Sequence, residues 1–370
     1  MGARRERRVT SAKKIHENFF REQLKGEEAL SRTTAEQLYG EATRFMLERP
    51  WEFLADEELI LVDDPESGER CYCCVMGAAG EWIGMYVYQG EESYRMYRKL
   101  AEGHKPDPYG YYEKQKGVSL EIVRAQELEA ADRVLLKAFE HPLKKGMLVP
   151  QFRAVRPGYL PWHVTEPEGR LLLQCLRAVD LFCATVTDEE LDEFWRKKDT
   201  FPLVVVPENK EQEDKVCLVT APAPGPAPIE VADLDEERIR RIAAECKKSE
   251  TILEAEHFFA PGIIGQKNER KMCLRPTIIA DANSGFLYHT EFGMAGESRA
   301  ASVSRALLAA MESGRFVPAE VLVKETALGT GLAGLGSALG FEVRTVKNLP
   351  ATHEAKKFLI EAISNGGLKF

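Results

Sequence analysis

The sequence predicts an α+β protein built from two domains. Between residues 51 and 90, three short apolar runs are separated by turn segments rich in Gly, Pro and Asp, which is the pattern of an antiparallel meander. From residue 276 onward, strand-like runs alternate with helix-like segments, and this alternation indicates parallel strands joined by crossover helices. The segment 221–228 has four prolines in eight residues, and its stiff composition predicts a linker between the two patterns.

Composition limits the classes of function. The 370 residues provide for two or three domains with apolar cores, and 44% of them are hydrophobic. The net charge of −9 argues against a protein that holds nucleic acid or anionic lipid mainly by electrostatic attraction. We expect a cytoplasmic protein, because no apolar run approaches the ~18–20 residues of a membrane span and the first residues lack the apolar core of a secretion signal.

A helical arm is expected at residues 1–50. Its two helices are predicted over 10–25 and 33–48, and the second begins with the cap residues Ser31 and Thr33, with Glu36 three residues after Thr33. Up to residue 25 the arm has eight Lys and Arg residues against three acidic ones. Such an arm can contact phosphates or an acidic partner, and it can equally be a solvated terminus.

Residues 51–220 are predicted to form an α+β domain that contains the meander. Strands are expected at 59–62, 71–76, 82–88, 118–124, 203–206 and 216–220, and helices at 91–102, 127–140, 166–182 and 188–198. The segment PQFRAVRPGYLPWHV, which begins at Pro150, is expected to be an ordered loop because its prolines and glycine enforce turns. Cys71 and Cys74 form a Cys-x-x-Cys sequence, but within a strand their side chains would point to opposite faces and could not share a metal.

Residues 221–270 are predicted to be the linker and a charged helix over 233–248, and residues 271–370 a second domain. In this domain the expected elements are strands at 276–282, 286–292, 319–325 and 341–346 and helices at 300–313, 328–339 and 353–363. The helix at 328–339 contains a Gly-x-Gly-x-x-Gly sequence that starts at Gly329. Four residues separate Gly329 from the preceding strand, so we expect these glycines to allow close packing of the helix on the sheet and not to bind a dinucleotide.

The order PWEFL, CYCCVMG, GMYVYQG and PQFRAVRPGYLPWHV resembles a family of functionally uncharacterised bacterial cytoplasmic proteins with two domains. The most specific part of this resemblance is the string Arg-Pro-Gly-Tyr-x-Pro-Trp from Arg156 to Trp162. The family implies the organisation and the compartment of the protein, and it carries no established activity.

The C-terminal domain resembles the ribonuclease H-like fold of integrase and transposase cores. In those enzymes one acid ends the first strand, a second ends the strand after the first helix, and a third lies on a later helix. The resemblance places Asp281, Glu325 and Glu354 at these positions. Only one hairpin precedes the first helix here, whereas those folds usually have three strands.

Two functions follow from this resemblance, and both remain open. A nuclease or strand-transfer enzyme would use the three carboxylates to hold two Mg²⁺ or Mn²⁺ ions, which activate water and stabilise the leaving oxygen. The other possibility is a non-catalytic binding or regulatory module with a protein or nucleic-acid partner. Lys324 next to Glu325 favours the second reading because it can neutralise that carboxylate. His289 would join an active site only if it faces Asp281.

A third class of function is a ligand-binding protein. Trp51, Tyr159 and Trp162 would line its pocket at the domain junction, where large aromatic surfaces can enclose an apolar ligand. The alternative is that these three side chains belong to the core.

Overall fold

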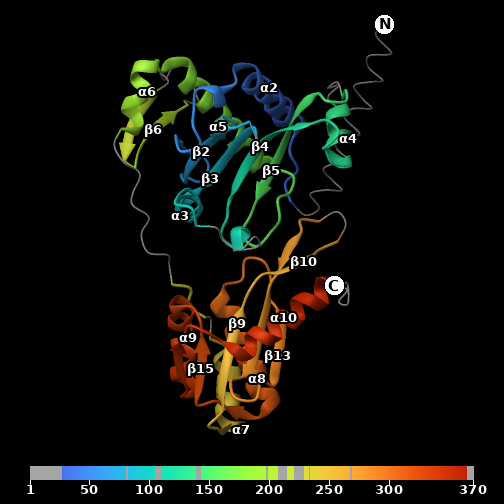
Figure 1. Ribbon diagram of the computed structural model, residues 1–370, viewed down its shortest axis with the longest axis vertical. Helices are drawn as coiled ribbons and strands as arrows, with labels where there is room; N and C mark the ends of the chain where they lie inside the picture. Colours follow the sequence, from blue (N-terminus) through green and yellow to red (C-terminus); the bar gives the residue numbers. More distant parts are fainter. Residues whose placement is uncertain are drawn as a thin grey trace. The chain divides into compact units, whose positions relative to one another are not determined.

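The computed structural model describes residues 27–80, 82–104, 110–138, 143–196, 199–206, 215–220, 229–232, 234–266 and 269–364. The predicted helix at 10–25, its basic run and the proline-rich segment 221–228 lie outside these ranges. The chain divides into two compact units (Figure 1). Unit 1 comprises Met1–Pro106, Lys114–Gly225 and Gly265–Lys271, and unit 2 comprises Asp107–Glu113, Pro226–Ile264 and Met272–Phe370.

Unit 1 contains a mixed sheet of seven strands in the order β5-β4-β3-β2-β1-β6-β7. The strands are β1 (Ile60–Asp63), β2 (Arg70–Met76), β3 (Gly84–Gln89), β4 (Gly117–Arg124), β5 (Leu148–Val155), β6 (Thr200–Val205) and β7 (Lys215–Thr220). The β1-β2-β3 meander is antiparallel, as the sequence predicts. β1 and β6 are parallel, and the other neighbouring pairs in this sheet are antiparallel.

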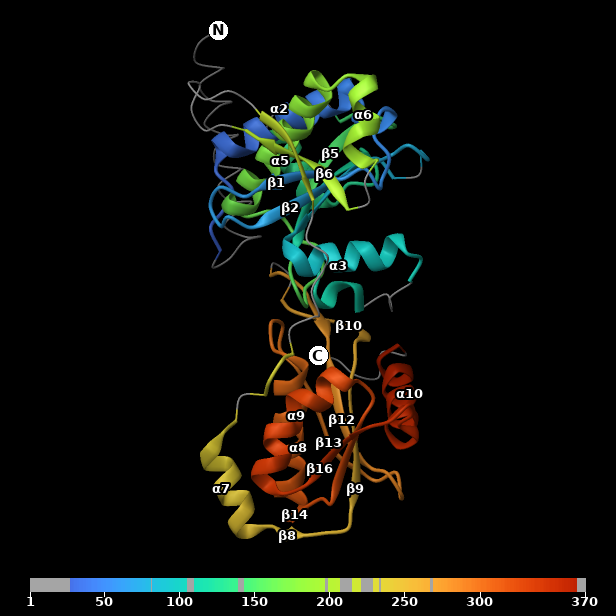
Figure 2. The ribbon, with the colours of Figure 1, turned by 90° about the vertical axis from the view of Figure 1, so that its left-hand side faces the viewer.

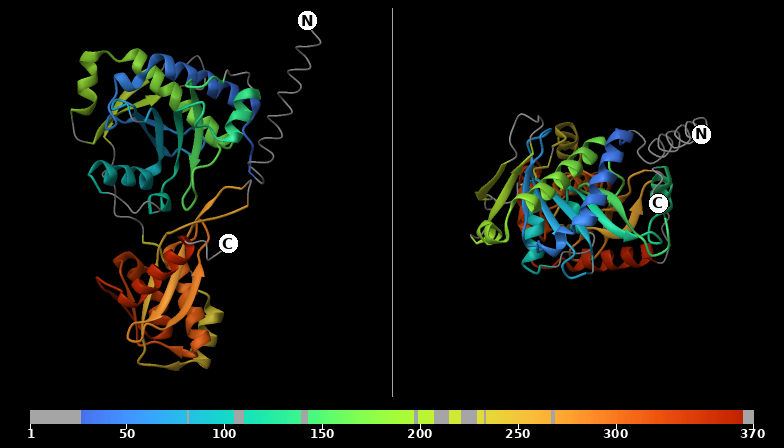
Figure 3. Two further views of the ribbon diagram at one scale, coloured as in Figure 1. Left: turned by 45° about the vertical axis from the view of Figure 1, so that its right-hand side comes forward. Right: turned by 90° about the horizontal axis from the view of Figure 1, so that it is seen from above.

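Helices cover both faces of this sheet. The unit contains α2 (Arg32–Glu48), the short 3₁₀ helix η1 (Pro50–Glu52), α3 (Gly90–Ala101), α4 (Ala130–Ala138), α5 (Glu166–Thr185) and α6 (Asp188–Trp195). α2 and α5 lie together on one face, and α3 lies on the other (Figures 2 and 3). β2 serves both layers: Cys71 belongs to the core beneath α5, whereas Tyr72 stacks on Tyr94 of α3 with ring centroids 4.2 Å apart. This alternation puts Cys71 and Cys74 on opposite faces, as predicted.

Residues 148–155 form β5, so the expectation of a loop over PQFRAVRPGYLPWHV was wrong for its first six residues. Pro150 and the later turn residues made this segment look irregular. β5 is the edge strand of the sheet among the described residues, and proline is tolerated at position 150 because its nitrogen faces away from β4; on the same outer side, Ala154 bonds to Trp162. The turn expected at Pro157 and Gly158 is present, with Gly158 at φ 81°.

Unit 2 contains a mixed sheet of five strands in the order β13-β12-β9-β15-β16. Its strands are β9 (Ile252–His257), β12 (Pro276–Asp281), β13 (Leu287–Phe292), β15 (Glu320–Val323) and β16 (Glu342–Thr345). β12 is antiparallel to both of its neighbours, β9 and β13, and β15 runs parallel to both β9 and β16. The parallel pairing of the last two of these strands agrees with their predicted crossover connection.

Helices flank this sheet as well. They are α7 (Glu236–Glu245), α8 (Arg299–Gly314), α9 (Thr326–Leu339) and α10 (Pro350–Ser364). Unit 2 also includes the short 3₁₀ helix η2 (Gly110–Glu113). α8 and α9 pack on one face of the sheet and α10 on the other (Figure 2). In the described residues, no helix of either unit is long and apolar enough to cross a membrane.

The sequence analysis predicted no strand between residues 221 and 275, and this was wrong. β9 forms the centre of the sheet of unit 2, β10 (Ala260–Ile264) pairs with β11 (Met272–Leu274), and the short β8 (Lys247–Lys248) pairs with β14 (Phe316–Val317). β9 was not predicted because a central strand is usually a continuous run of apolar residues, whereas ILEAEH contains two glutamates. The sheet therefore has three strands before α8 instead of one hairpin.

Gly329 allows the predicted close packing of α9 on the sheet, because a Cβ atom there would lie 3.4 Å from Val323 of β15 and 3.1 Å from Thr345 of β16; two further glycines lie against other segments. A Cβ atom on Gly331 would lie 2.2 Å from the backbone oxygen of Glu230, and one on Gly336 would lie 2.8 Å from that of Phe341. Gly334 is on the exposed side of the same helix, where a Cβ atom would meet only Leu234 at 3.7 Å. The apolar face of α9, formed by Leu328, Leu332, Leu335 and Leu339, is in the core.

We expect Gly331→Ala to lower the free energy of unfolding by about 2 kcal/mol, because the added methyl collides with backbone atoms that cannot rotate away. Gly334→Ala is the matched control in the same helix. It should leave stability unchanged or raise it by up to about 1 kcal/mol, since alanine is the better helix former. Urea denaturation of the two variants measures the difference, and equal stabilities would contradict this account of α9.

Candidate functional site

Asp281 ends β12 and closes the turn into β13. Its Oδ1 atom accepts hydrogen bonds from the backbone N–H of Asn283 (3.0 Å) and from the N–H (2.7 Å) and hydroxyl (2.8 Å) of Ser284. These bonds, the Ser284 N–H first, lower the pKa of the Asp281 carboxyl below its ordinary value. Asp281 therefore has a structural role in this turn, which Gly285 completes with a φ of 72°.

Glu325 and Glu354, the other two predicted acids, lie in different surroundings. Glu325 directly precedes α9 and forms an ion pair with Arg299, which is also paired with Glu113. Glu354 is exposed on α10. Across the described part of the chain, no three His, Cys, Asp or Glu side chains form a group that could hold a metal ion, so the structure does not bring the three predicted acids together.

Two acids of unit 2 that the sequence analysis did not single out lie on β9 and face α10. The Glu254 side chain is 1% exposed, and its Oε2 atom accepts the backbone N–H of Thr352 at 2.8 Å, in the first turn of the helix. Glu256 accepts the Thr352 hydroxyl at 3.1 Å and pairs with Lys356 at 2.9 Å. A carboxylate at this end of a helix is stabilised by the free N–H groups and by the helix dipole. Alternation of apolar and acidic residues in ILEAEH was the signal that could have revealed the pair.

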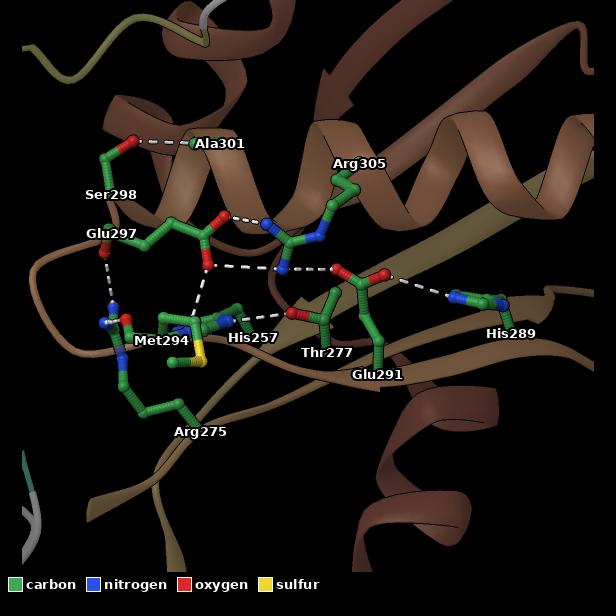
Figure 4. A network of polar contacts seen from close by, with 10 residues as sticks. All are labelled: His257, Arg275, Thr277, His289, Glu291, Met294, Glu297, Ser298, Ala301 and Arg305. Carbon is green, nitrogen blue, oxygen red and sulfur yellow. Dashed lines mark hydrogen bonds and ion pairs between the residues drawn. The ribbon is translucent and has the colours of Figure 1, made fainter. Parts of the chain in front are cut away.

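A network of polar contacts fastens the loop between β13 and α8 to the sheet (Figure 4). Arg275 donates hydrogen bonds to the backbone oxygens of Met294 (2.7 Å) and Glu297 (2.9 Å). Arg305 of α8 pairs with Glu297 in the loop and with Glu291 on β13, the latter at 2.7 Å. Each positive side chain of the network thus has a negative or carbonyl partner, which leaves it little capacity to attract a charged ligand.

Two further contacts complete this network. His289 contacts Glu291 at 3.2 Å and has no contact with Asp281, so it does not complete a site there. Ser298 caps α8 by accepting the N–H of Ala301 at 3.1 Å.

His257 is the buried histidine of this network. Its Nδ1 atom lies 2.9 Å from the hydroxyl of Thr277, and its Nε2 atom has no hydrogen-bond partner among the described residues. Burial, followed by the positive charges of Arg275, Arg299 and Arg305, holds the pKa of His257 well below its ordinary value. The imidazole is therefore neutral at pH 7.

Ser302 lies close to this histidine. A Cβ atom on Gly293 would approach the Ser302 hydroxyl to 2.8 Å and the His257 Cε1 atom to 3.5 Å. A serine beside a neutral histidine resembles the start of a nucleophilic site. However, the Ser302 side chain is 0% exposed, so no substrate can reach its hydroxyl. The group acts as a polar part of the core.

Unit 1 also buries charged groups. Arg153 donates to both oxygens of Asp132, at 3.0 and 2.7 Å, and Gln151 donates to the same carboxylate at 2.8 Å. His163 lies beside this pair, with its Nδ1 atom 3.7 Å from Asp132. Burial, with a further contribution from Arg153, lowers the pKa of His163 from 6.5 to about 4.

The three aromatic residues predicted to bind a ligand have the following positions. Trp51 is 8% exposed and packs on Phe45 with ring centroids 5.5 Å apart. Trp162 is half-buried against the core of unit 1 and contacts the ring of His163. The backbone of Tyr159 donates to Arg156 in the turn after β5. These contacts explain Trp51 and Trp162 as packing residues, and their proposed ligand role stays a prediction.

Comparison with protein families matches an N-terminal and a C-terminal part of the chain. Residues 36–202 match the family described as "Domain of unknown function (DUF7309)", and residues 238–360 match "Domain of unknown function (DUF6930)". The DUF7309 match extends from α2 into β6, and the DUF6930 match extends from α7 into α10 and includes the whole sheet of unit 2. A search of curated proteins found no match.

We expect Glu254→Ala to lower the free energy of unfolding by about 2–3 kcal/mol, because the first turn of α10 loses a buried acceptor and its N–H groups stay unpaired. Glu354→Ala removes an exposed carboxylate from the same helix and should change stability by less than about 0.5 kcal/mol. Thermal and urea unfolding measure both variants. A tolerated Glu254→Ala would show that Glu254 does not fix α10 to the sheet.

The lowered pKa of His163 predicts that the folded protein loses stability in acid. The unfolded state takes up a proton near pH 6.5, whereas the folded state excludes it down to about pH 4. Stability from this group is therefore complete above pH 6.5 and is lost as pH falls toward 4, by about 3 kcal/mol in total. His163→Gln should remove this part of the pH dependence, while His353→Gln at an exposed position should not. Urea denaturation at several pH values measures this dependence. If the free energy of unfolding changes with pH in the same way in wild type and His163→Gln, His163 is not its source.

Proposed function

We propose that the protein is a non-catalytic binding protein in which unit 2 is a ribonuclease H-like scaffold. The strand order supports this scaffold: three antiparallel strands are followed by two parallel strands that add on the side of the first one, β9. If β9 is the first strand of this scaffold, the acid expected on the first strand is Glu254 or Glu256 and not Asp281.

One observation supports a non-catalytic function: the carboxylates of Asp281, Glu325 and Glu254 already form contacts within the fold. Asp281 forms its turn, Glu325 is paired with Arg299, and Glu254 caps α10. Two-metal catalysis requires several free oxygen ligands that converge on cations about 4 Å apart. The described residues contain no such group.

A binding role is further supported by a cavity in unit 1. The cavity has a volume of about 340 Å³ and is lined mainly by apolar side chains of α2, α5 and the segments that adjoin them. Ligand sites of proteins are typically concave and apolar with a few polar groups, and their volumes begin at ~300 Å³. This cavity is therefore our candidate ligand site, and its lining does not include Trp51, Tyr159 or Trp162.

Calorimetric titration of Mn²⁺ into the purified protein tests the absence of a metal centre. We expect no saturable binding into the millimolar range, equal heats for wild type and Asp281→Asn, and no cleavage of DNA, RNA or hybrid substrates, because the carboxylates are engaged in structural contacts. Glu256→Gln is the matched variant on β9. Saturable heat that disappears in Asp281→Asn would restore the nuclease prediction, and heat that disappears only in Glu256→Gln would place a metal site on β9.

A further inference from the structure

The cavity of unit 1 lies where the end of α2 meets the end of α5. Phe45, Leu176, Val179 and Phe182 are buried and form its apolar wall. Phe53, which follows η1, lines it with a side chain that is 60% exposed. An apolar interior beside an accessible aromatic ring suits a small organic molecule with an apolar body.

Charged side chains line the same cavity, and most of them are acidic. Glu41, Glu48 and Asp180 contribute carboxylates, whereas Arg44 contributes the one positive charge of the lining. Arg44 is paired with Asp180 at 2.9 Å, and Glu41 is paired with Arg177, outside the lining, at 3.2 Å. Glu48 has no cationic partner within the described ranges of the chain.

The position of Glu48 adds to this imbalance. It is the last residue of α2, and no basic residue occupies the last turn of that helix; Arg49, the C-cap residue that follows, is paired with Glu52 at 2.7 Å. Carbonyl oxygens and the helix dipole make a helix C-terminus partly negative, so a carboxylate there is unfavourable unless a cation is bound nearby. Burial, more than the charges of Glu41 and Glu48, raises the pKa of Asp180, and Arg44 lowers it.

We propose that this cavity binds a small organic cation, with its apolar body against Phe45 and the half-buried Val186 and its ammonium group at Glu48. The exposed ring of Phe53 adds a surface that attracts cations through its π electrons. A neutral ligand would leave Glu48 unpaired, and an anionic ligand would be repelled. The inference rests on the proposed binding function and adds the chemical class of the ligand.

The lining thiol does not suggest a reactive site. Burial raises the pKa of Cys183 to about 12, with a smaller contribution from the charge of Asp180, so the thiol stays protonated and unreactive at neutral pH. The cavity is thus suited to reversible binding.

Three probes of matched size test the proposal: 4-phenylbutylamine, 4-phenylbutanol and 4-phenylbutanoate, measured by calorimetry and ligand-observed NMR at pH 7. We expect the amine to bind about five- to tenfold more tightly than the alcohol, and the carboxylate to bind most weakly. The advantage of the amine should shrink as salt is added, because the carboxylates of the lining are accessible to solvent.

Variants locate the binding. Glu48→Gln should remove most of the advantage of the amine and leave the affinity for the alcohol unchanged, whereas Glu36→Gln, an exposed change in α2 outside the cavity, should alter neither. Ala184→Trp adds a bulky side chain at an exposed position of the lining and should abolish binding of both probes. Circular dichroism and thermal unfolding verify that each variant is folded.

The outcomes separate the two proposals. Equal binding of amine and alcohol, or an amine preference that survives Glu48→Gln, would overturn the cationic ligand and leave the cavity as a binding site. Probes that do not bind, or that still bind to Ala184→Trp, would overturn the cavity as the site. Metal-dependent nuclease activity would instead overturn the non-catalytic function and would not affect the ligand class.

Discussion

The architecture of unit 2 depends on a carboxylate buried in the middle of its sheet. Glu254 lies on the central strand, with β12 on one side and β15 on the other, and its carboxylate reaches the first turn of α10. An unpaired carboxylate at 1% exposure would be very costly, so the helix must begin where its N–H groups meet it. The same contact therefore satisfies the charge and fixes the position of α10 on the sheet. The strand order brings Glu256 to the same face, where it adds Lys356 to the contact.

This use of charge distinguishes the two faces of the sheet. On the face covered by α8, Arg305 compensates Glu291 of β13 and Glu297 of the following loop, and Arg275 binds backbone oxygens of that loop. On the face covered by α10, the compensation comes from a helix terminus and one lysine. In both places the polar groups hold elements together, and their partners are already supplied by the chain. The cavity of unit 1 differs, because Glu48 lines it without a cationic partner in the residues described by the structure.

The sequence allowed much of the fold to be predicted. The meander, the main helices of both units and the parallel strands at the end followed from apolar spacing and turn residues, which depend on local structure. β5 and β9 did not, since Pro150 and Glu254 are tolerated only because of tertiary context: a free edge in one case and a helix terminus in the other.

The place of Asp281 in the sheet was predicted wrongly for the same reason. Asp281 ends the second strand of the sheet and not the first, and only the pairing of β9 with β12 reveals this. The cavity could not be anticipated from the sequence either. Its wall joins residues of α2 to residues of α5 that are more than a hundred positions away, and no local pattern records which apolar side chains leave a space between them.

Pro150 has a consequence for how unit 1 behaves at high concentration. The N–H of Ile122, its partner on β4, donates to Ile83 and so points away from β5. In an antiparallel pair of this kind the backbone nitrogen of Pro150 must also point outward, to the free side of β5. A proline there offers no hydrogen to an incoming strand, and this protects the edge of a seven-stranded sheet from templating intermolecular association.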